Sequence, residues 1–522
     1  MLKKMFALIV MSILLVLSQA SQVAAQEPEK PAEKEAKPAD KDAKPAPEPK
    51  EESSVTDHTL KIGAQTIAYK ATASTTLIKD EKGDPTASIF TIAYTRSDTK
   101  DFSQRPISFV YNGGPGSSSI WLHMGAFGPR RVVTTDAGPT PPPPFKLVDN
   151  GDCLLDKTDL VFVDPVGTGF SRAVGKSKDK DFWGIDQDVK SLAQFIATYI
   201  SRNGRWNSPK FLIGESYGTF RSAALGNYLQ NHNGMYLNGI VLISSVLDLG
   251  TISFPQGNDM PYIFYLPSYA ATAYYHKMLQ EPPTDLNAFL AEARKFASGE
   301  YAAALMKGAT LSVTEKADIA KKVSHFTGLS EDYLIKADLR VNLPQFMVEL
   351  QRSRGLATGR LDARFSGPQP DLLAEYAFDD PQSDAVSGAF VAAFNSYVRE
   401  DLKFGKDLTY NTSADIHDWD WKRTGGGRGY GFPGAPNVED DLVEALVTNP
   451  QLHVEVENGL YDLATPFFAT EFTMTHLGLP ENLQKNIGLK YYDAGHMMYL
   501  HEEDLAKLKA NVASFIDAAT MR

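Results

Sequence analysis

The pentapeptide Gly214-Glu215-Ser216-Tyr217-Gly218 has the spacing of a segment that exposes a reactive serine. It follows the apolar run KFLIG at residues 210–214, which is typical of a strand, and it opens a helical pattern over residues 217–229. A tight strand-to-helix turn leaves no room for side chains on its flanks, so the two glycines let the serine project. The sequence therefore predicts a nucleophile elbow, with Ser216 above the positive end of a helix.

A serine hydroxyl is a weak nucleophile at neutral pH, and it needs an imidazole beside it that a carboxylate orients. In α/β hydrolases the chain order is serine, acid, histidine, with the last two on loops after late strands. Of the ten histidines, only His496 lies in a small-residue loop directly after a late apolar run, IGLKYY at residues 487–492. His496 is therefore the predicted general base.

Three aspartates compete for the role of the acid. Asp462 follows the apolar run HVEVE at residues 453–457, and Asp248 follows GIVLIS at residues 239–244. Asp493 is only three residues from His496, which is too close in sequence for it to face the ring. Loop placement favours Asp462 and keeps Asp248 as an alternative.

A glycine-rich loop follows another apolar run, ISFVY at residues 107–111. Its sequence is NGGPGSSS, residues 112–119. Such a loop brings backbone N–H groups beside the serine and supplies half of an oxyanion hole, while the N–H of Tyr217 supplies the other half. No Gly-Lys-Ser/Thr follows, so the loop is a poor match to a phosphate-binding loop.

Apolar runs that alternate with helical patterns position these loops. Continuous β-branched and aromatic runs separated by helices indicate a mainly parallel sheet that helices cover on both faces. We therefore expect the α/β-hydrolase fold, with the early, more alternating strands forming an antiparallel hairpin. The expected strands are residues 87–96, 107–111, 160–164, 210–214, 239–244, 453–457 and 487–492, and the clearest helices are residues 186–200 and 217–229.

The pattern changes between the two halves of this core. Residues 253–424 are rich in Ala, Tyr and Leu at helical spacing and contain no clear core strand. We expect them to form a mostly helical cap inserted above the sheet, between core halves at residues 55–252 and 425–522.

Composition excludes several classes of protein and site. The 64 acidic and 52 basic side chains give a net charge of −12, which repels phosphate backbones and argues against nucleic-acid binding. Cys153 is the only cysteine, so an intramolecular disulfide and a cysteine-built metal site are both excluded. No metal and no organic cofactor are expected, and the composition leaves the oligomeric state open.

The N-terminus has the order of a secretory signal. Lys3 and Lys4 precede an apolar run over residues 5–17, and Val23-Ala24-Ala25 follows, so we expect cleavage near Ala25 and no stable membrane span afterwards. Residues 26–54 are mostly Glu, Lys, Pro, Ala and Asp and should form a disordered tether. A secreted chain of this size without disulfides indicates a bacterial periplasm or exterior.

Four motifs in the same order resemble the signatures of the serine carboxypeptidases, the group that includes carboxypeptidase Y and cathepsin A. They are NGGPGSSS at residues 112–119, PVGTGFS at 165–171, GESYG at 214–218 and AGH at 494–496. The resemblance spans residues 105–496, although the insertion carries no matching motif, and it fits a bacterial-type member of the family.

The resemblance implies a role for each motif. It implies a catalytic triad of Ser216, Asp462 and His496, and oxyanion donors at Gly114 and Tyr217. It also implies that Asn112 and Glu215 bind the terminal carboxylate of a peptide substrate. A carboxylic acid that faces a carboxylate must share a proton, so binding should strengthen in mild acid. The alternative is that Glu215 only braces the elbow through hydrogen bonds.

Two positions depart from the family pattern. Ala126 stands where the family has an acidic residue that shares the carboxylate site, and Ser117 replaces the family's cysteine. Arg130 or Arg131 could supply the missing recognition, although two solvated arginines are the simpler interpretation. Since Cys153 is the only thiol, sensitivity to thiol reagents should be absent.

These observations predict a secreted serine-type carboxypeptidase that hydrolyses the C-termini of peptides or proteins through an acyl-enzyme. One alternative is an esterase or acyltransferase that uses the same triad, because acyl-enzyme chemistry does not fix the acceptor. Another is a non-catalytic surface-binding homologue, against which the intact Ser216, Asp462 and His496 argue.

Overall fold

Ten strands form one sheet in the part of the chain that the structure, a computed structural model, describes: residues 48–424 and 434–521. The expected signal peptide, the tether up to residue 47 and the start of the second core half lie outside the described residues. The strand order is β1 (Ser53–Ile62), β2 (Gln65–Lys79), β3 (Pro85–Arg96), β7 (Asp159–Val163), β4 (Ile107–Tyr111), β9 (Lys210–Glu215), β10 (Gly239–Ile243), β13 (His453–Gly459) and β14 (Ile487–Tyr492), with β8 (Arg172–Ala173) beside β3.

The sheet has a parallel and an antiparallel part. Strands β7, β4, β9, β10, β13 and β14 are parallel to one another, whereas β1, β2 and β3 form an antiparallel meander whose last strand pairs antiparallel with β7. Every residue of β4, β9 and β10 is buried, as expected for strands covered on both faces. The sequence therefore predicted the α/β-hydrolase fold correctly.

Register brings the ends of the parallel strands into one row. Tyr111 of β4 is paired with Gly214 of β9, and Ile243 of β10 is paired with both Glu215 and Glu457. The loops that follow β4, β9, β13 and β14 therefore all leave the sheet at its carboxyl edge, which is where ligands bind in sheets of this type.

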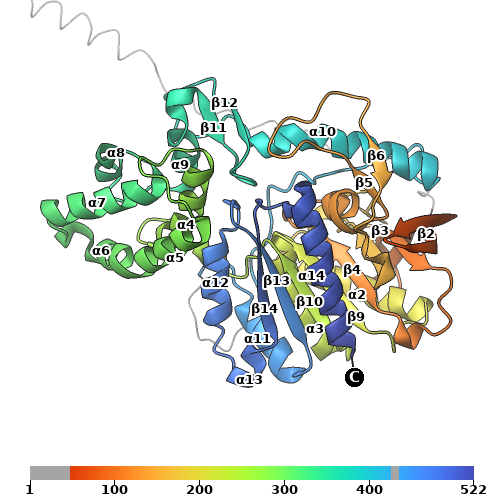
Figure 1. Ribbon diagram of the computed structural model, residues 1–522. Helices are drawn as coiled ribbons and strands as arrows, with labels where there is room; N and C mark the ends of the chain where they lie inside the picture. Colours follow the sequence, from red (N-terminus) through yellow and green to blue (C-terminus); the bar gives the residue numbers. More distant parts are fainter. Residues whose placement is uncertain (1–47, 425–433, 522) are drawn as a thin grey trace, which may run out of the picture. The chain divides into compact units, whose positions relative to one another are not determined.

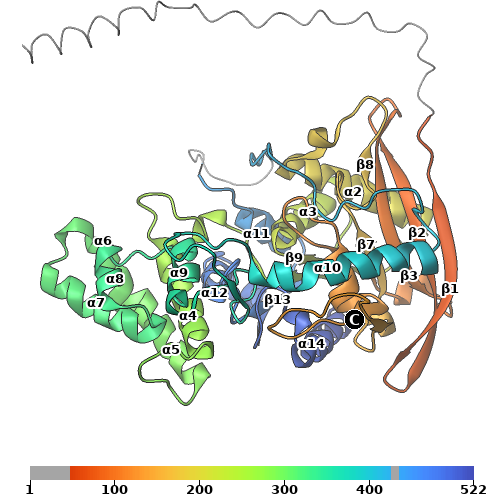
Figure 2. The same ribbon diagram turned by 90° about the horizontal axis from the view of Figure 1, so that it is seen from above.

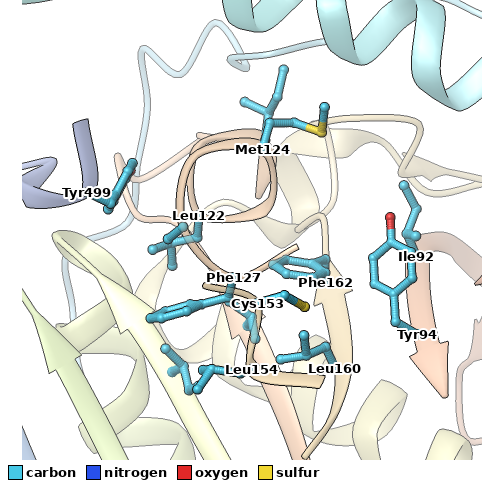
Figure 3. Close-up of a cluster of buried hydrophobic side chains, with 14 of the residues drawn as sticks. Ile92, Tyr94, Leu122, Met124, Phe127, Cys153, Leu154, Leu160, Phe162 and Tyr499 are labelled. Carbon is cyan, nitrogen blue, oxygen red and sulfur yellow. The ribbon is translucent and has the colours of Figure 1, made fainter. Parts of the chain in front are cut away.

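Helices cover both faces of the sheet. Helices α2 (Ile185–Arg202), α3 (Tyr217–Asn233) and α11 (Glu439–Thr448) share a hydrophobic cluster with one face. Helix α14 (Glu502–Thr520) packs on the other face, in a cluster that also contains the π-helix η2 (Leu122–Phe127) and helix α10 (Pro381–Ser396). Figure 1 shows α14 running along the sheet, and Figure 3 shows the buried side chains around η2.

The first part of the insertion is a helical cap with its own core (Figure 2). Aromatic residues join its helices, as where the rings of Tyr269 and Phe346 stack with centroids 3.8 Å apart. Helix α12 (Phe467–Thr475), which follows β13, packs against the cap. The cap helices are α4 (Met260–Tyr275), α5 (Leu286–Phe296), α6 (Ala302–Lys307), α7 (Val313–Thr327), α8 (Glu331–Lys336) and α9 (Leu343–Glu349).

The structure differs from the sequence-based boundaries at two places. Residues 51–54 were expected in the tether, but Ser53 begins β1 and Glu51 accepts hydrogen bonds from Leu77 and Arg202, so the folded part starts earlier. The insertion was expected to form a cap through residue 424, but its later part returns to the core, because Phe390 and Phe394 of α10 are buried in the sheet-face cluster.

Among the described residues, no helix is long and apolar enough to cross a membrane. Short elements complete this part of the chain. Two small hairpins pair β5 (Arg130–Val132) with β6 (Leu147–Asp149), and β11 (Leu356–Thr358) with β12 (Ser366–Pro368). The remaining helical turns are η1 (Phe102–Gln104), η3 (Leu154–Asp156), η4 (Asp179–Phe182), η5 (Leu249–Thr251), η6 (Ala297–Tyr301), η7 (Gly308–Thr310), η8 (Arg352–Arg354), η9 (Tyr397–Asp401), α13 (Glu481–Gln484) and η10 (Met498–Leu500).

Candidate active site

Ser216 lies at the sharp turn between β9 and α3. Its backbone has φ 60° and ψ −130°, a conformation that a side-chain-bearing residue rarely adopts and that is concentrated at functional sites. A Cβ on Gly214 would lie 2.2 Å from the carbonyl oxygen of Gly218, so only glycine fits there. The Ser216 N–H donates to Ile243 of β10 at 3.0 Å, which ties the turn to the neighbouring strand. The local sequence therefore builds the expected elbow.

Asp462 and His496 form a buried pair at the same edge of the sheet. His496 Nδ1 is 2.8 Å from Asp462 Oδ2, and the residues are 3% and 0% exposed. The second oxygen of Asp462 accepts the backbone N–H groups of Ala464 and Thr465 at 2.8 and 2.9 Å. The Thr465 hydroxyl also donates to Asp462 Oδ2 at 2.7 Å, so the loop fixes the carboxylate in one orientation.

The environment of His496 favours a ring that carries its proton on Nδ1. Burial alone would lower the pKa of His496, but the charge of Asp462 and its hydrogen bond raise the pKa above 6.5. The Ser244 hydroxyl holds the backbone of this loop by donating to the His496 carbonyl at 2.7 Å. Because Nδ1 carries a proton and donates it in a hydrogen bond to Asp462, Nε2 is the ring nitrogen that is available for proton transfer.

Ser216 and His496 line one cavity of about 380 Å³. The described residues contain no hydrogen bond between the Ser216 hydroxyl and the His496 ring. In hydrolases without substrate this contact is often long and tightens only in the complex. The structure thus places Ser216 and His496 at one cavity, and Asp462 lies behind His496 with the Asp462–His496 contact already formed.

Two backbone N–H groups are available beside Ser216. Neither Gly114 nor Tyr217 donates its N–H to an acceptor among the described residues. The loop of Gly114 approaches the elbow closely, because a Cβ on Gly113 would lie 2.3 Å from the Tyr217 nitrogen. Free donors that are fixed in position before a reaction can stabilise an oxyanion without reorganising.

Asn112 and Glu215 also line this cavity, and they contact each other. Asn112 Nδ2 donates to Glu215 Oε1 at 2.9 Å. Burial raises the pKa of Glu215 to about 7, although His496, Tyr499 and Asn112 all act to lower it. Glu215 is therefore a carboxyl group that can hold a proton near neutral pH and donate it to an anion in the cavity.

Comparisons with known proteins show a likeness to one family over part of the chain. Residues 83–322 match the family model described as serine carboxypeptidase. Over these residues, a little under half of its length, the chain is similar to the serine carboxypeptidase family. It is 30% identical over 161 residues to the pheromone-processing carboxypeptidase KEX1 of Saccharomyces cerevisiae, which is 30% of this chain and 21% of the yeast protein. It is 26% identical over 192 residues to serine carboxypeptidase-like 22 of Arabidopsis thaliana, which is 36% of this chain and 39% of the plant protein.

A solved structure of a relative extends the likeness of fold to most of the chain. The crystal structure of KEX1(delta)p from Saccharomyces cerevisiae superposes with a TM-score of 0.52 at 17% identity, covering 86% of this chain and 91% of that chain. In sequence, however, the matched segments span only about a fifth to two fifths of the relatives' own length. Asp462 and His496 lie beyond the residues that match the family model.

The structure separates the competing candidates. Asp248 caps the short helix η5 by accepting the Gly250 N–H at 2.8 Å, and the ring of His496 contacts Asp462 instead. Arg130 pairs with Asp149, and Arg131 pairs with Glu502, and neither lines the cavity. The structure therefore fits the interpretation of Arg130 and Arg131 as surface groups. It does not fit the alternative that they recognise the carboxylate of a substrate.

Cys153 is fully buried, and burial raises the pKa of its thiol to about 12, so it is an inert core residue. Ser117, at the position of the family's cysteine, accepts the indole N–H of Trp121 at 3.0 Å. The cavity therefore has the hydroxyl of Ser117, which forms a hydrogen bond, where the family pattern has a cysteine thiol.

Sequence reasoning missed a buried ion pair below the elbow. Arg221 of α3 donates from Nε to Asp188 of α2 at 2.7 Å and from Nη1 to the carbonyl oxygen of Asn112 at 2.7 Å. Both charged side chains are buried, so the pair holds Asn112 against the elbow at a substantial desolvation cost. Charged residues at core-facing positions of two otherwise apolar helices are the signal that could have identified it.

Sequence reasoning also missed the contact between the insertion and the histidine loop. The His496 N–H donates to the carbonyl oxygen of Leu361 at 2.6 Å, and the Gly495 N–H donates to Asp362 Oδ2 at 3.0 Å. Asp362 is fully buried and pairs with Arg364 at 2.7 Å. The segment between β11 and β12 therefore fixes the backbone of the loop that carries His496.

Proposed function

We propose that this chain is a serine carboxypeptidase, which removes residues from the C-termini of peptides or proteins through an acyl-enzyme. The proposal rests on the groups that lie together at one cavity. A cavity at the carboxyl edge of the sheet is lined by a strained serine, by a histidine with a buried aspartate partner, and by a glutamate that is held by an asparagine. The first three groups suit acyl transfer, and the glutamate–asparagine pair suits recognition of a free carboxylate.

In the proposed reaction Ser216 Oγ attacks the scissile carbonyl while His496 Nε2 takes its proton. Asp462 keeps the ring in the required tautomer and stabilises its cationic form. The N–H groups of Gly114 and Tyr217 receive the oxyanion, and His496 then returns the proton to the leaving amine. Water then attacks the acyl carbonyl while His496 takes one of its protons, and His496 returns that proton to Ser216 Oγ as the peptide leaves with a new carboxyl group.

The peptide's terminal carboxylate would bind beside Asn112 and Glu215. Below about pH 7 Glu215 is largely protonated and can donate a hydrogen bond to that carboxylate. Above this pH two carboxylates would face each other and repel. Because His496 must be neutral to accept a proton and its pKa is raised, activity should also fall in more acidic solution. The pH range of optimal activity should therefore be limited on the acidic side by the pKa of His496 and on the alkaline side by the pKa of Glu215.

Secretion or a periplasmic location, after cleavage near Ala25, belongs to the same proposal. It is supported by the charged, apolar and small-residue order of residues 1–25.

The proposal is tested by comparing N-blocked dipeptides that have either a free or an amidated C-terminus, from mild acid to neutral pH. We expect hydrolysis of the free acid only, with kcat/KM falling about tenfold per pH unit above the pKa of Glu215. A fluorophosphonate should label the wild-type chain but not Ser216→Ala. If the amidated dipeptide were hydrolysed as fast as the free acid, or if only simple esters were hydrolysed, the triad would belong to an esterase or acyltransferase. If the fluorophosphonate did not label the wild-type chain, the chain would be a binding protein.

Glu215→Gln sharpens this test. The amide keeps the shape and can donate a hydrogen bond at every pH, so the alkaline fall in kcat/KM should disappear for free-acid peptides. Glu457→Gln is the matched control, because Glu457 is also buried at the end of a strand with a pKa raised to about 8 by burial, but does not line the cavity.

A further inference from the structure

Ala126 leaves the proposed carboxylate site without the second acid that the family pattern contains at this position. Ala126 lies in the π-helix η2 and is fully buried, so it offers no polar group to Glu215. The neighbouring residue is Gly125, and a Cβ there would lie 2.6 Å from Cε2 and 2.7 Å from Cδ2 of Tyr499. The ring of Tyr499 therefore packs directly on the turn that lacks the acid.

Tyr499 comes from η10, three residues after His496. Figure 3 shows its ring beside the turn that carries Leu122. The residue is 2% exposed and belongs to the core cluster of the sheet face. A buried phenol normally has a hydrogen-bond partner, because an unpaired buried hydroxyl is costly.

Two buried polar atoms at this place lack a partner of standard geometry among the described residues. They are the Tyr499 hydroxyl and Oε2 of Glu215, whose other oxygen accepts Asn112. The two groups are nevertheless close enough to influence each other. Burial raises the pKa of Tyr499 well above 10, and the nearby charge of Glu215 adds to this effect.

The titratable groups that face Glu215 are His496, Asp462 and Tyr499. Arg360 lines the same cavity from the insertion. Tyr499 itself faces Glu215 and the neutral amide of Asn112. Tyr499 is thus the one neutral hydroxyl donor in this set, and it approaches Glu215 from the side of η2 and not from the cavity.

We propose that Tyr499 is a positioning residue for the carboxylate site, whose phenol donates a hydrogen bond to Glu215 Oε2 and takes the place of the family's second acid. This inference rests on the proposed carboxypeptidase function. A phenol stays neutral across the working pH range, so Glu215 titrates as a single group instead of sharing a proton with a second carboxyl. A donor to the carboxylate also favours its charged form and limits how far burial raises its pKa.

The test is Tyr499→Phe, which removes the hydroxyl and keeps the ring against Gly125. Loss of the donor should raise the pKa of Glu215, so the alkaline fall in kcat/KM for a free-acid dipeptide should move up by about one pH unit. Tyr397→Phe is the matched control, since Tyr397 is buried in the same cluster and its hydroxyl contacts Tyr94 at 3.0 Å. It should leave the profile unchanged.

A second measurement does not depend on turnover. Calorimetry in two buffers gives the protons taken up when an N-blocked amino acid, a reaction product, binds to Ser216→Ala slightly above pH 7. Adding Tyr499→Phe should reduce that uptake, because more Glu215 is already protonated before binding. An unchanged pH profile and unchanged proton uptake in Tyr499→Phe would overturn the role of Tyr499, while a wild-type chain without preference for free-acid peptides would overturn the carboxypeptidase function itself.

Discussion

Ser216 and His496 reach the cavity from loops that follow β9 and β14, with Asp462 behind His496 on the loop after β13, whereas Arg360 and Gln382 reach it from the insertion. The first group is placed by the register of parallel strands, whose ends form one row at the carboxyl edge. The second group is placed by hydrophobic packing of the insertion on itself and on the sheet face.

The two regions also differ in the kind of side chain that they offer. The sheet edge supplies the buried, charged and strained groups that acyl transfer needs. The insertion supplies mainly neutral polar and apolar walls, in Leu361, Gln382, Ser383, Val386, Ser387, Thr412 and Ser413, with Arg360 as its charged lining residue. Changes at the edge should therefore alter kcat for every substrate, and changes in the insertion should alter the choice among substrates.

The largest effect should come from the sheet edge. Asp462→Asn keeps the size of the side chain but favours the wrong tautomer of His496, so kcat should fall about 10⁴-fold for every peptide. Steady-state kinetics on two unrelated dipeptides measures this. Asp248→Asn, at the alternative aspartate after β10, is the control and should change kcat by less than about twofold. Comparable losses in both variants would contradict the assignment of the acid.

An intermediate effect should come from the place where the insertion touches the catalytic loop. Asp362→Ala leaves Arg364 buried without its main partner and removes the acceptor of the Gly495 N–H, so unfolding free energy should fall by about 3 kcal/mol. Urea unfolding measures it, and kcat should fall as well because the His496 loop loosens.

Asp259→Ala provides the comparison inside the insertion. Asp259 pairs with Arg340 at 2.7 Å but is 31% exposed at its side chain, so its loss should cost no more than about 1 kcal/mol and leave kcat intact. If Asp362→Ala lowered the unfolding free energy and kcat no more than Asp259→Ala does, the insertion would line the cavity without supporting the His496 loop.

The sheet edge was predictable because its signals are local. The run ISFVY coincides with β4, since a strand buried on both faces is a continuous apolar run. The run IGLKYY coincides with β14, although this strand lies at the edge of the sheet and is mostly half-buried. The elbow was visible because the close approach of Gly214 and Gly218 depends on neighbours in sequence. The first two strands were missed, since β1 is largely exposed and its alternating pattern contains few apolar residues.

The insertion was less predictable because its contacts are distant in sequence. Nothing local in the Ala- and Phe-rich helix α10 shows that it packs on the sheet face while α4 packs in the cap. Asp362 meets Gly495 across 133 residues, and Tyr499 meets Gly125 from the other end of the chain. Such pairs are set by tertiary packing, which a single sequence does not encode as a motif.

The smallest effect should come from the rim of the cavity. Arg360 lines it from the insertion, is exposed and forms no ion pair with the described residues, so its charge is available to a substrate. A partly solvated contact of this kind is worth about 0.2–1 kcal/mol, so Arg360→Gln should lower kcat/KM for peptides with Asp or Glu at the cleaved bond by up to about fivefold. Neutral peptides should keep their kcat.

Competition between an acidic and a neutral dipeptide in one reaction measures the preference for the acidic peptide directly. If charge is responsible, the difference in this preference between wild type and Arg360→Gln should be smaller at high salt than at low salt. Arg354→Gln is the control, because Arg354 is also an arginine of the insertion but donates to the His276 carbonyl at 3.1 Å, away from the cavity. A fall in kcat for neutral peptides in Arg360→Gln would show that the insertion takes part in the chemical step, and the division between the two regions would then fail.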